Sequence, residues 1–158
     1  MAEYNQTIEN SFREFFKGDE LKTALDFTEF LETNNMIRGK NCEIHYKNEL
    51  ACYLDTPSEQ NKWFRIWTVG DFSNEYEGFP INEHTKEIAR ANVVKCGGCG
   101  GANSCASGKT EVIFGQEFTN VCAGIEKLAM RFDNPNAETL KCAKKMLEMT
   151  MYSIDNRI

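Results

Sequence analysis

The chain has 158 residues, of which 41% are hydrophobic and 11% aromatic, and its formal net charge is −6. This composition is typical of one folded globular domain rather than of a disordered segment. The acidic charge argues against nucleic-acid binding, because it repels phosphate backbones. No apolar run approaches the roughly 18 residues that span a bilayer, so no membrane segment is expected.

The cysteine content indicates the cellular compartment. The chain has seven cysteines, and its N-terminus lacks the basic segment followed by an apolar one that marks a secretory signal. Thiols of a protein without such a signal stay reduced and bind metals more often than they form disulfides. We therefore expect a cytoplasmic protein.

The N-terminal part is predicted to be helical. A short helix is expected around residues 8–15, and apolar side chains recur at helical spacing over 21–31. Asp19 is a candidate for the N-cap of this second helix, and residues 34–35, both asparagine, are expected to end it.

Three strands are predicted next. Residues 42–46 and 50–54 alternate between apolar and polar, and a three-residue loop at 47–49 would bring their apolar sides onto one face. That face would carry Cys42, Ile44, Tyr46, Leu50, Cys52 and Leu54. The third strand, 62–69, would put Phe64, Ile66 and Thr68 on one face, and the other face would carry Trp63, Arg65, Trp67 and Val69.

The second half is predicted to contain two helices and two strands. A helix begins near Asn82, strands cover 110–114 and 125–132, and a final helix has Asn134 at its cap and Pro135 in its first turn. Because helices and strands are segregated, we predict a single α+β domain over residues 1–158. Its mostly antiparallel sheet would be packed by the N-terminal helices and the long C-terminal helix, with residues 96–122 as a cysteine-rich metal-binding excursion.

Four of the cysteines form the most specific chemical signal: Cys96, Cys99, Cys105 and Cys122. The first two are the ends of Cys-Gly-Gly-Cys, a tight turn in which glycines let two thiolates reach one ion. A structural zinc ion is held by four ligands in a tetrahedron, so the four cysteines predict a zinc site. His84 is an alternative to the third or fourth of these ligands.

The Cys-Gly-Gly-Cys turn resembles half of a zinc ribbon or of a rubredoxin-type site, over residues 96–101 only. A wider resemblance, over about 96–158, is to small bacterial proteins of unknown activity with a C-terminal cysteine-rich segment, found especially in anaerobes. The stretches that carry it are Gly108-Lys109-Thr110, Ile113-Phe114-Gly115-Gln116-Glu117-Phe118, Asn120-Val121-Cys122 and Phe132-Asp133-Asn134-Pro135. This resemblance implies no catalytic residue.

Other interpretations of the cysteine segment stay open. The thiols are also compatible with free, buried cysteines, with redox or disulfide chemistry, and with an iron–sulfur cluster. The stretch 103–110 differs from a phosphate-binding loop motif at one residue, Asn103, where the motif has glycine. That motif requires a following helix, whereas the residues after it have the pattern of a strand.

A second candidate site is the face that carries Trp63, Arg65 and Trp67. A guanidinium between two indoles suits a planar or carboxylate-bearing ligand, and the acidic loop 71–79 is expected to close this face in part. The alternative is that one tryptophan fills the core beneath the final helix and that Arg65 pairs with an acidic neighbour. We expect a non-enzymatic binding module with a structural zinc ion and a small-molecule or protein partner; the alternative is a thiol- or metal-dependent enzyme.

Overall fold

A computed structural model of the chain describes residues 2–97, 108–122 and 128–158. These residues form four helices, α1 (Ala2–Phe15), α2 (Gly18–Thr33), α3 (Glu83–Ala91) and α4 (Ala137–Asn156). None of these described helices has the length and hydrophobicity needed to cross a membrane.

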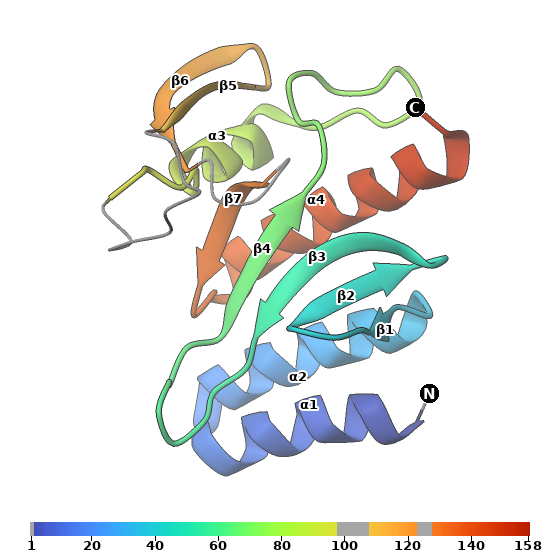
Figure 1. The fold of residues 1–158 in the computed structure, drawn as a ribbon, viewed down its shortest axis with the longest axis vertical. Coiled ribbons are helices and arrows are strands. Elements are labelled where there is room, and N and C mark those ends of the chain that lie inside the picture. The colour runs from blue at the N-terminus through green and yellow to red at the C-terminus, as the bar shows by residue number, and fades with distance from the viewer. Residues whose placement is uncertain (1, 98–107, 123–127) are drawn as a thin grey trace.

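The strands form an antiparallel sheet and a separate hairpin (Figure 1). The five-stranded sheet has the order β1-β2-β3-β4-β7, and its strands are β1 (Ile37–Arg38), β2 (Glu43–Tyr46), β3 (Glu49–Asp55), β4 (Arg65–Val69) and β7 (Leu128–Asp133). The hairpin consists of β5 (Lys109–Ile113) and β6 (Gln116–Val121). The prediction of an α+β fold with an antiparallel sheet is confirmed.

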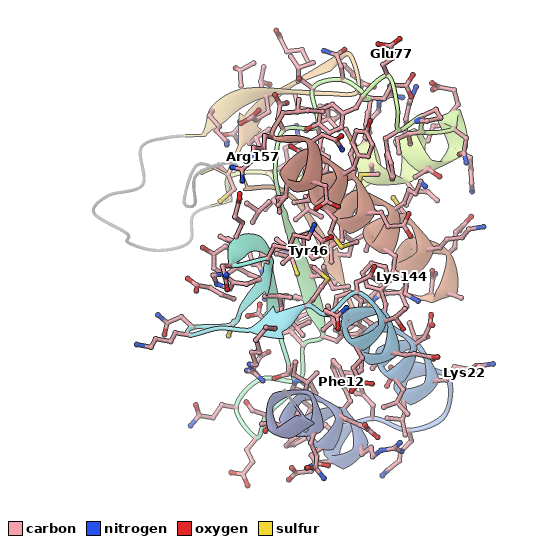
Figure 2. All side chains as sticks on the ribbon, turned by 90° about the vertical axis from the view of Figure 1, so that its right-hand side faces the viewer. Phe12, Lys22, Tyr46, Glu77, Lys144 and Arg157 are labelled. Atoms are coloured by element: carbon pink, nitrogen blue, oxygen red, sulfur yellow. The ribbon has the colours of Figure 1, made fainter. Side chains whose placement is uncertain are left out.

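One face of the sheet is covered by helices. Figures 1 and 2 show α1, α2 and α4 on the same side of the strands. The strand residues on that side are buried, among them Ile44, Leu54, Ile66 and Phe132. Phe64 joins the two layers, since its ring lies 4.9 Å from that of Phe12 and 5.7 Å from that of Phe27. This side is therefore the hydrophobic core, as the alternation within 62–69 predicted.

The β2–β3 hairpin differs from the prediction in its loop. Only Lys47 and Asn48 lie in the turn, both with positive φ, and Tyr46 pairs with Glu49. Positive φ at both central residues is the geometry of a tight turn that matches strand twist. A register shift after Ile44 then restores its pairing with Cys52, so both residues reach the core despite the shorter loop.

The start of the final helix also needs correction. The N-cap of α4 is Asn136 rather than Asn134, and Asn136 forms a reciprocal capping box with Thr139. Asn134 instead bonds the backbone of Phe64, accepting at Oδ1 from its N–H at 2.8 Å and donating its own N–H to its carbonyl at 2.6 Å. Asn134 thus fixes the end of β7 against the residue before β4.

The start of α2 also departs from the prediction. Its N-cap is Lys17, which makes no side-chain capping bond, and Asp19 lies in the first turn instead. A carboxylate there still interacts favourably with the positive end of the helix dipole.

Candidate functional site

A short extended segment after α3 connects the two sheets. Val93 pairs with Met130 of β7, and Lys95 pairs with Val121 of β6. The Cys96 N–H donates to the carbonyl of Asn120 at 2.7 Å, and the Cys122 N–H donates to that of Val94 at 2.8 Å. Residues 92–97 therefore act as an added strand that holds the β5–β6 hairpin at the edge of the main sheet.

This pairing places Cys96 and Cys122 on one face. Residues 96 and 122 each lie one position beyond the Lys95–Val121 pair, so their side chains are diagonal neighbours on the side opposite buried Val121. Both cysteines are partly exposed and free, and both line the same cavity. The structure thus brings together two of the four predicted metal ligands, which are 26 positions apart in the chain.

Gly108 and Asn120 support this ladder. The Asn120 side-chain amide donates to the Cys96 carbonyl at 3.1 Å. A Cβ at position 108 would lie 2.8 Å from the Asn120 Cα, closer than real Cβ contacts allow. Because Gly108 has no Cβ, the chain can pass close to Asn120, whose side chain bonds the backbone of Cys96.

The other predicted ligands are not part of this arrangement. Cys99 and Cys105 lie outside the described residues. His84 is on α3, and its Nε2 lies 2.8 Å from a carboxylate oxygen of Glu138 at the start of α4, so it does not line the cavity of Cys96 and Cys122. Within 2–97, 108–122 and 128–158, no three histidine, cysteine or acidic side chains form a cluster that could hold a metal.

The uncovered face of the sheet carries the predicted aromatic–arginine row. The Arg65 guanidinium lies 4.0 Å above the Trp63 ring, and Trp63 is 42% exposed. Trp67 is partly buried, and its indole N–H donates to Asp55 at 2.9 Å. Neither indole is a core residue beneath α4, so this part of the alternative interpretation was wrong. Its other part, an acidic partner for Arg65, is confirmed by Asp133.

Strand β7 adds a second arginine that the sequence analysis did not single out. Arg131 pairs in register with Trp67, and its guanidinium lies 4.9 Å from the Trp67 ring centre. Arg131 also binds Asp133 with two contacts, Nε to Oδ1 at 2.7 Å and Nη2 to Oδ2 at 2.9 Å. Arg65 Nε lies 3.1 Å from the same Oδ1 without forming a hydrogen bond. One carboxylate therefore holds two guanidinium groups against two indoles.

A cavity of about 600 Å³ joins this row to the two thiols. Among the described residues, its wall is formed by the segment from 91 to 97, by strands β4 and β7, and by the residue after β6. These residues are Trp67, Ala91, Asn92, Val93, Val94, Lys95, Cys96, Gly97, Cys122, Arg131 and Asp133. Its volume lies within the range of about 300–1,000 Å³ found for small-molecule sites. Trp67 is thus the one member of the predicted trio that lines the cavity.

The acidic loop 71–79 lies elsewhere, and the prediction that it partly closes the Trp63–Trp67 face was wrong. The rings of Tyr76 and Phe79 pack against Tyr152 of α4, at 6.0 and 5.5 Å between centres, and Phe72 packs edge-on against Phe114. These apolar contacts fix the loop on α4 and the hairpin.

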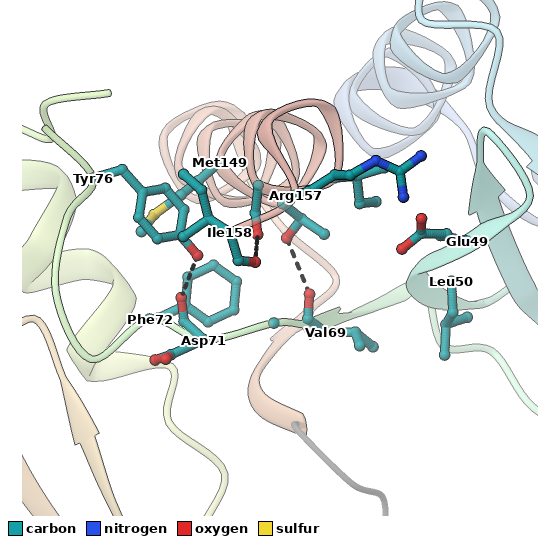
Figure 3. Close-up of a pocket in the computed structure, with 13 residues that line it drawn as sticks. Glu49, Leu50, Val69, Asp71, Phe72, Tyr76, Met149, Arg157 and Ile158 are labelled. Carbon is teal, nitrogen blue, oxygen red and sulfur yellow. Dashed lines mark hydrogen bonds between the residues drawn. The ribbon is translucent and has the colours of Figure 1, made fainter. Parts of the chain in front are cut away.

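A second cavity, of about 350 Å³, lies beside this loop at the end of α4 (Figure 3). Two hydroxyls bond carbonyls of the same cavity wall: the Thr150 hydroxyl donates to the Val69 carbonyl at 3.0 Å, and the Ser153 hydroxyl to that of Ile158 at 3.0 Å. The charged side chains of Glu49 and Arg157 also line this cavity.

Two further cysteines are structural. Cys52 and Cys142 are buried, and burial raises the pKa of both thiols, that of Cys142 to about 12. A thiol with so high a pKa is a poor nucleophile and a poor metal ligand at neutral pH. The phosphate-binding loop is also excluded, because Lys109 and Thr110 begin a strand rather than a helix.

Comparison of the chain with protein-family models, with curated protein sequences and with solved structures finds no match. The site must therefore be interpreted from its own geometry.

Proposed function

We propose that this protein is a non-enzymatic binding module of the cytoplasm, stabilised by a zinc ion that Cys96 and Cys122 help to hold. The observation that carries the proposal is the ladder between residues 94–96 and 120–122, which brings two partly exposed thiols onto one cavity wall. Thiolate is the ligand type that structural zinc sites use most, and zinc is the predicted metal.

The register favours a shared metal over a disulfide. Diagonal neighbours of an antiparallel pair have Cα atoms about 7–8 Å apart, whereas a disulfide needs about 4.4–6.8 Å. Two thiolates on one tetrahedral zinc have sulfurs roughly 3.8 Å apart, as follows from Zn–S bonds of about 2.3 Å. Two cysteine side chains at diagonal positions can point toward one ion and reach this sulfur–sulfur distance without movement of the backbone.

Cys99 and Cys105 complete the proposed ligand set on the strength of the sequence. Cys99 follows Cys96 at the spacing of a zinc knuckle, and Cys105 supplies the fourth thiolate. A site with four thiolates is closed, which favours a structural role over Lewis-acid catalysis, because catalysis needs an open coordination position.

The proposal is tested by metal analysis of the purified protein and of single Cys→Ser variants. We expect about one zinc per chain in the unmodified protein and loss of zinc in Cys96→Ser and Cys122→Ser. Cys42→Ser is the matched control, since Cys42 is also partly exposed but lies in the turn directly before β2. Metal-free protein with rapidly reacting thiols would contradict the proposal, and visible absorption with bound iron would favour an iron–sulfur site.

A further inference from the structure

The cavity beside Trp67 presents an arginine whose position is fixed and whose hydrogen-bonding capacity is not exhausted. A guanidinium carries five N–H donors. Asp133 takes the Nε side of Arg131, through the contacts at 2.7 and 2.9 Å. This leaves the Nη1–Nη2 edge, for which the described residues supply no further hydrogen-bond partner. Such an edge matches a carboxylate through two parallel bonds.

The arginine is held in place before any ligand arrives. Asp133 fixes the plane of the guanidinium, and the Trp67 ring supports one of its faces at 4.9 Å. Trp67 is itself held by the hydrogen bond from its indole N–H to Asp55 at 2.9 Å. Preorganisation of this kind lowers the entropic cost of binding, because the side chains are already ordered.

The rest of the cavity suits a planar apolar group. Ala91, Val93 and Val94 contribute apolar wall, and the Trp67 indole contributes aromatic surface. The volume of about 600 Å³ has room for a ligand with one or two rings. The net charge of −6 disfavours polyanions, so a ligand with a single negative charge fits best.

We infer that this cavity binds a small planar aromatic carboxylate. Its carboxylate would bond the Nη1–Nη2 edge of Arg131, and its ring would pack against Trp67, Val93 and Val94. The inference goes beyond the zinc proposal. The two proposed sites share one cavity, whose wall also carries Cys96 and Cys122, but the carboxylate is held by Arg131 and Trp67 of β7 and β4 and does not require the metal. It also differs from the prediction made from residues 62–69, which placed the ligand on Arg65. The cavity assigns this role to Arg131, since Arg65 does not line it.

Titration calorimetry with 2-naphthoate as the probe and 2-naphthamide as its neutral counterpart tests this inference on the full chain. We expect 2-naphthoate to bind and 2-naphthamide to bind about tenfold or more weakly, because the amide cannot form the charge-assisted pair with Arg131. Equal affinity for the two compounds, or no binding of 2-naphthoate at millimolar concentration, would overturn the inference.

Three variants locate the site. Arg131→Lys keeps the charge but loses the paired donors, and should weaken 2-naphthoate binding about tenfold. Trp67→Leu should weaken it as well, whereas Trp63→Leu, on the same face but outside the cavity, should leave it unchanged. Circular dichroism verifies that each variant is folded. If Arg131→Lys does not fold, the comparison of 2-naphthoate with 2-naphthamide on the unmodified protein tests the inference. Equal loss of binding in Trp67→Leu and Trp63→Leu would refute the assignment of the ligand to this cavity.

Discussion

Phe64, directly before β4, offers a sharp test of which face of the sheet is the core. Its ring is 2% exposed and contacts Phe12 and Phe27, whereas neighbouring Trp63 is 42% exposed and contacts Arg65 on the opposite face. Replacing a buried phenylalanine with alanine costs about 3–5 kcal/mol, part of which is the aromatic pairing with the two helices. Trp63→Ala removes a partly exposed ring and a cation–π contact worth about 0.5–1 kcal/mol.

Because part of the Trp63 ring is also buried, Trp63→Ala costs more than the cation–π contact alone, but Phe64→Ala is still expected to lower the free energy of unfolding more. Urea unfolding followed by far-ultraviolet circular dichroism measures both values. Phe64→Leu, expected to cost about 1–2 kcal/mol, serves as the reference if the alanine variant does not fold. The assignment of faces would be refuted if Trp63→Ala cost as much as Phe64→Ala.

Four further outcomes are expected. Chelation of the metal should leave the helical circular-dichroism signal largely intact, because the buried core lies between the helices and the sheet and not at the thiols; complete loss of the signal would show that the metal holds the whole fold. Gly108→Ala should weaken zinc in chelator competition, since its Cβ would collide with the Asn120 backbone, and unchanged affinity would refute this role. Asn136→Ala should cost about 1 kcal/mol of unfolding free energy by removing the α4 cap, and no loss in urea titration would contradict it. The pKa of Glu75 is lowered from 4.5, mainly by the backbone N–H of Ile81 and also by Lys86. The Glu75 carboxylate therefore stabilises the fold above about pH 4.5, and this stabilisation is lost as pH falls through the lowered pKa. Glu75→Gln should flatten the pH dependence of the unfolding free energy in that range, and an unchanged pH dependence would argue against it.

Periodicity predicted the helices from apolar side chains at helical spacing, and it predicted the two sheet faces from the alternation over 63–68. Val69, expected on the face of Trp67, is instead buried next to Thr68, where the pairing of β4 with β7 is irregular. The alternation of Phe64, Ile66 and Thr68 with Trp63, Arg65 and Trp67 corresponds directly to the covered and uncovered sides of the sheet. Strand β6 was missed, since its polar residues carry no apolar alternation: only Val121 of Gln116–Val121 is buried.

Details of turns and caps depended on competing local chemistry. Asn134 and Asn136 are both good caps. The reciprocal capping box with Thr139 favours Asn136, and the tertiary bond to the Phe64 backbone engages Asn134 elsewhere. The two-residue turn at Lys47-Asn48 contains no glycine, so its positive φ values gave no signal in the sequence.

The site could be predicted only in part. Spacing identified Cys96 and Trp67 as chemically interesting, but nothing local indicates that β7 places Arg131 beside Trp67. That contact follows from strand order, which sequence alone did not supply. A pattern of alternating charge in Arg131 and Asp133 was the available signal, and it resembles an ordinary solvent-facing strand.

The measurement that tests the zinc proposal most directly is X-ray absorption at the zinc edge of the purified protein. The proposal predicts a first coordination shell of sulfur at about 2.3 Å, with Cys122→Ser abolishing zinc binding or replacing one sulfur. A shell of nitrogen and oxygen alone at about 2.0–2.1 Å, or the absence of zinc from freshly purified protein, would contradict it.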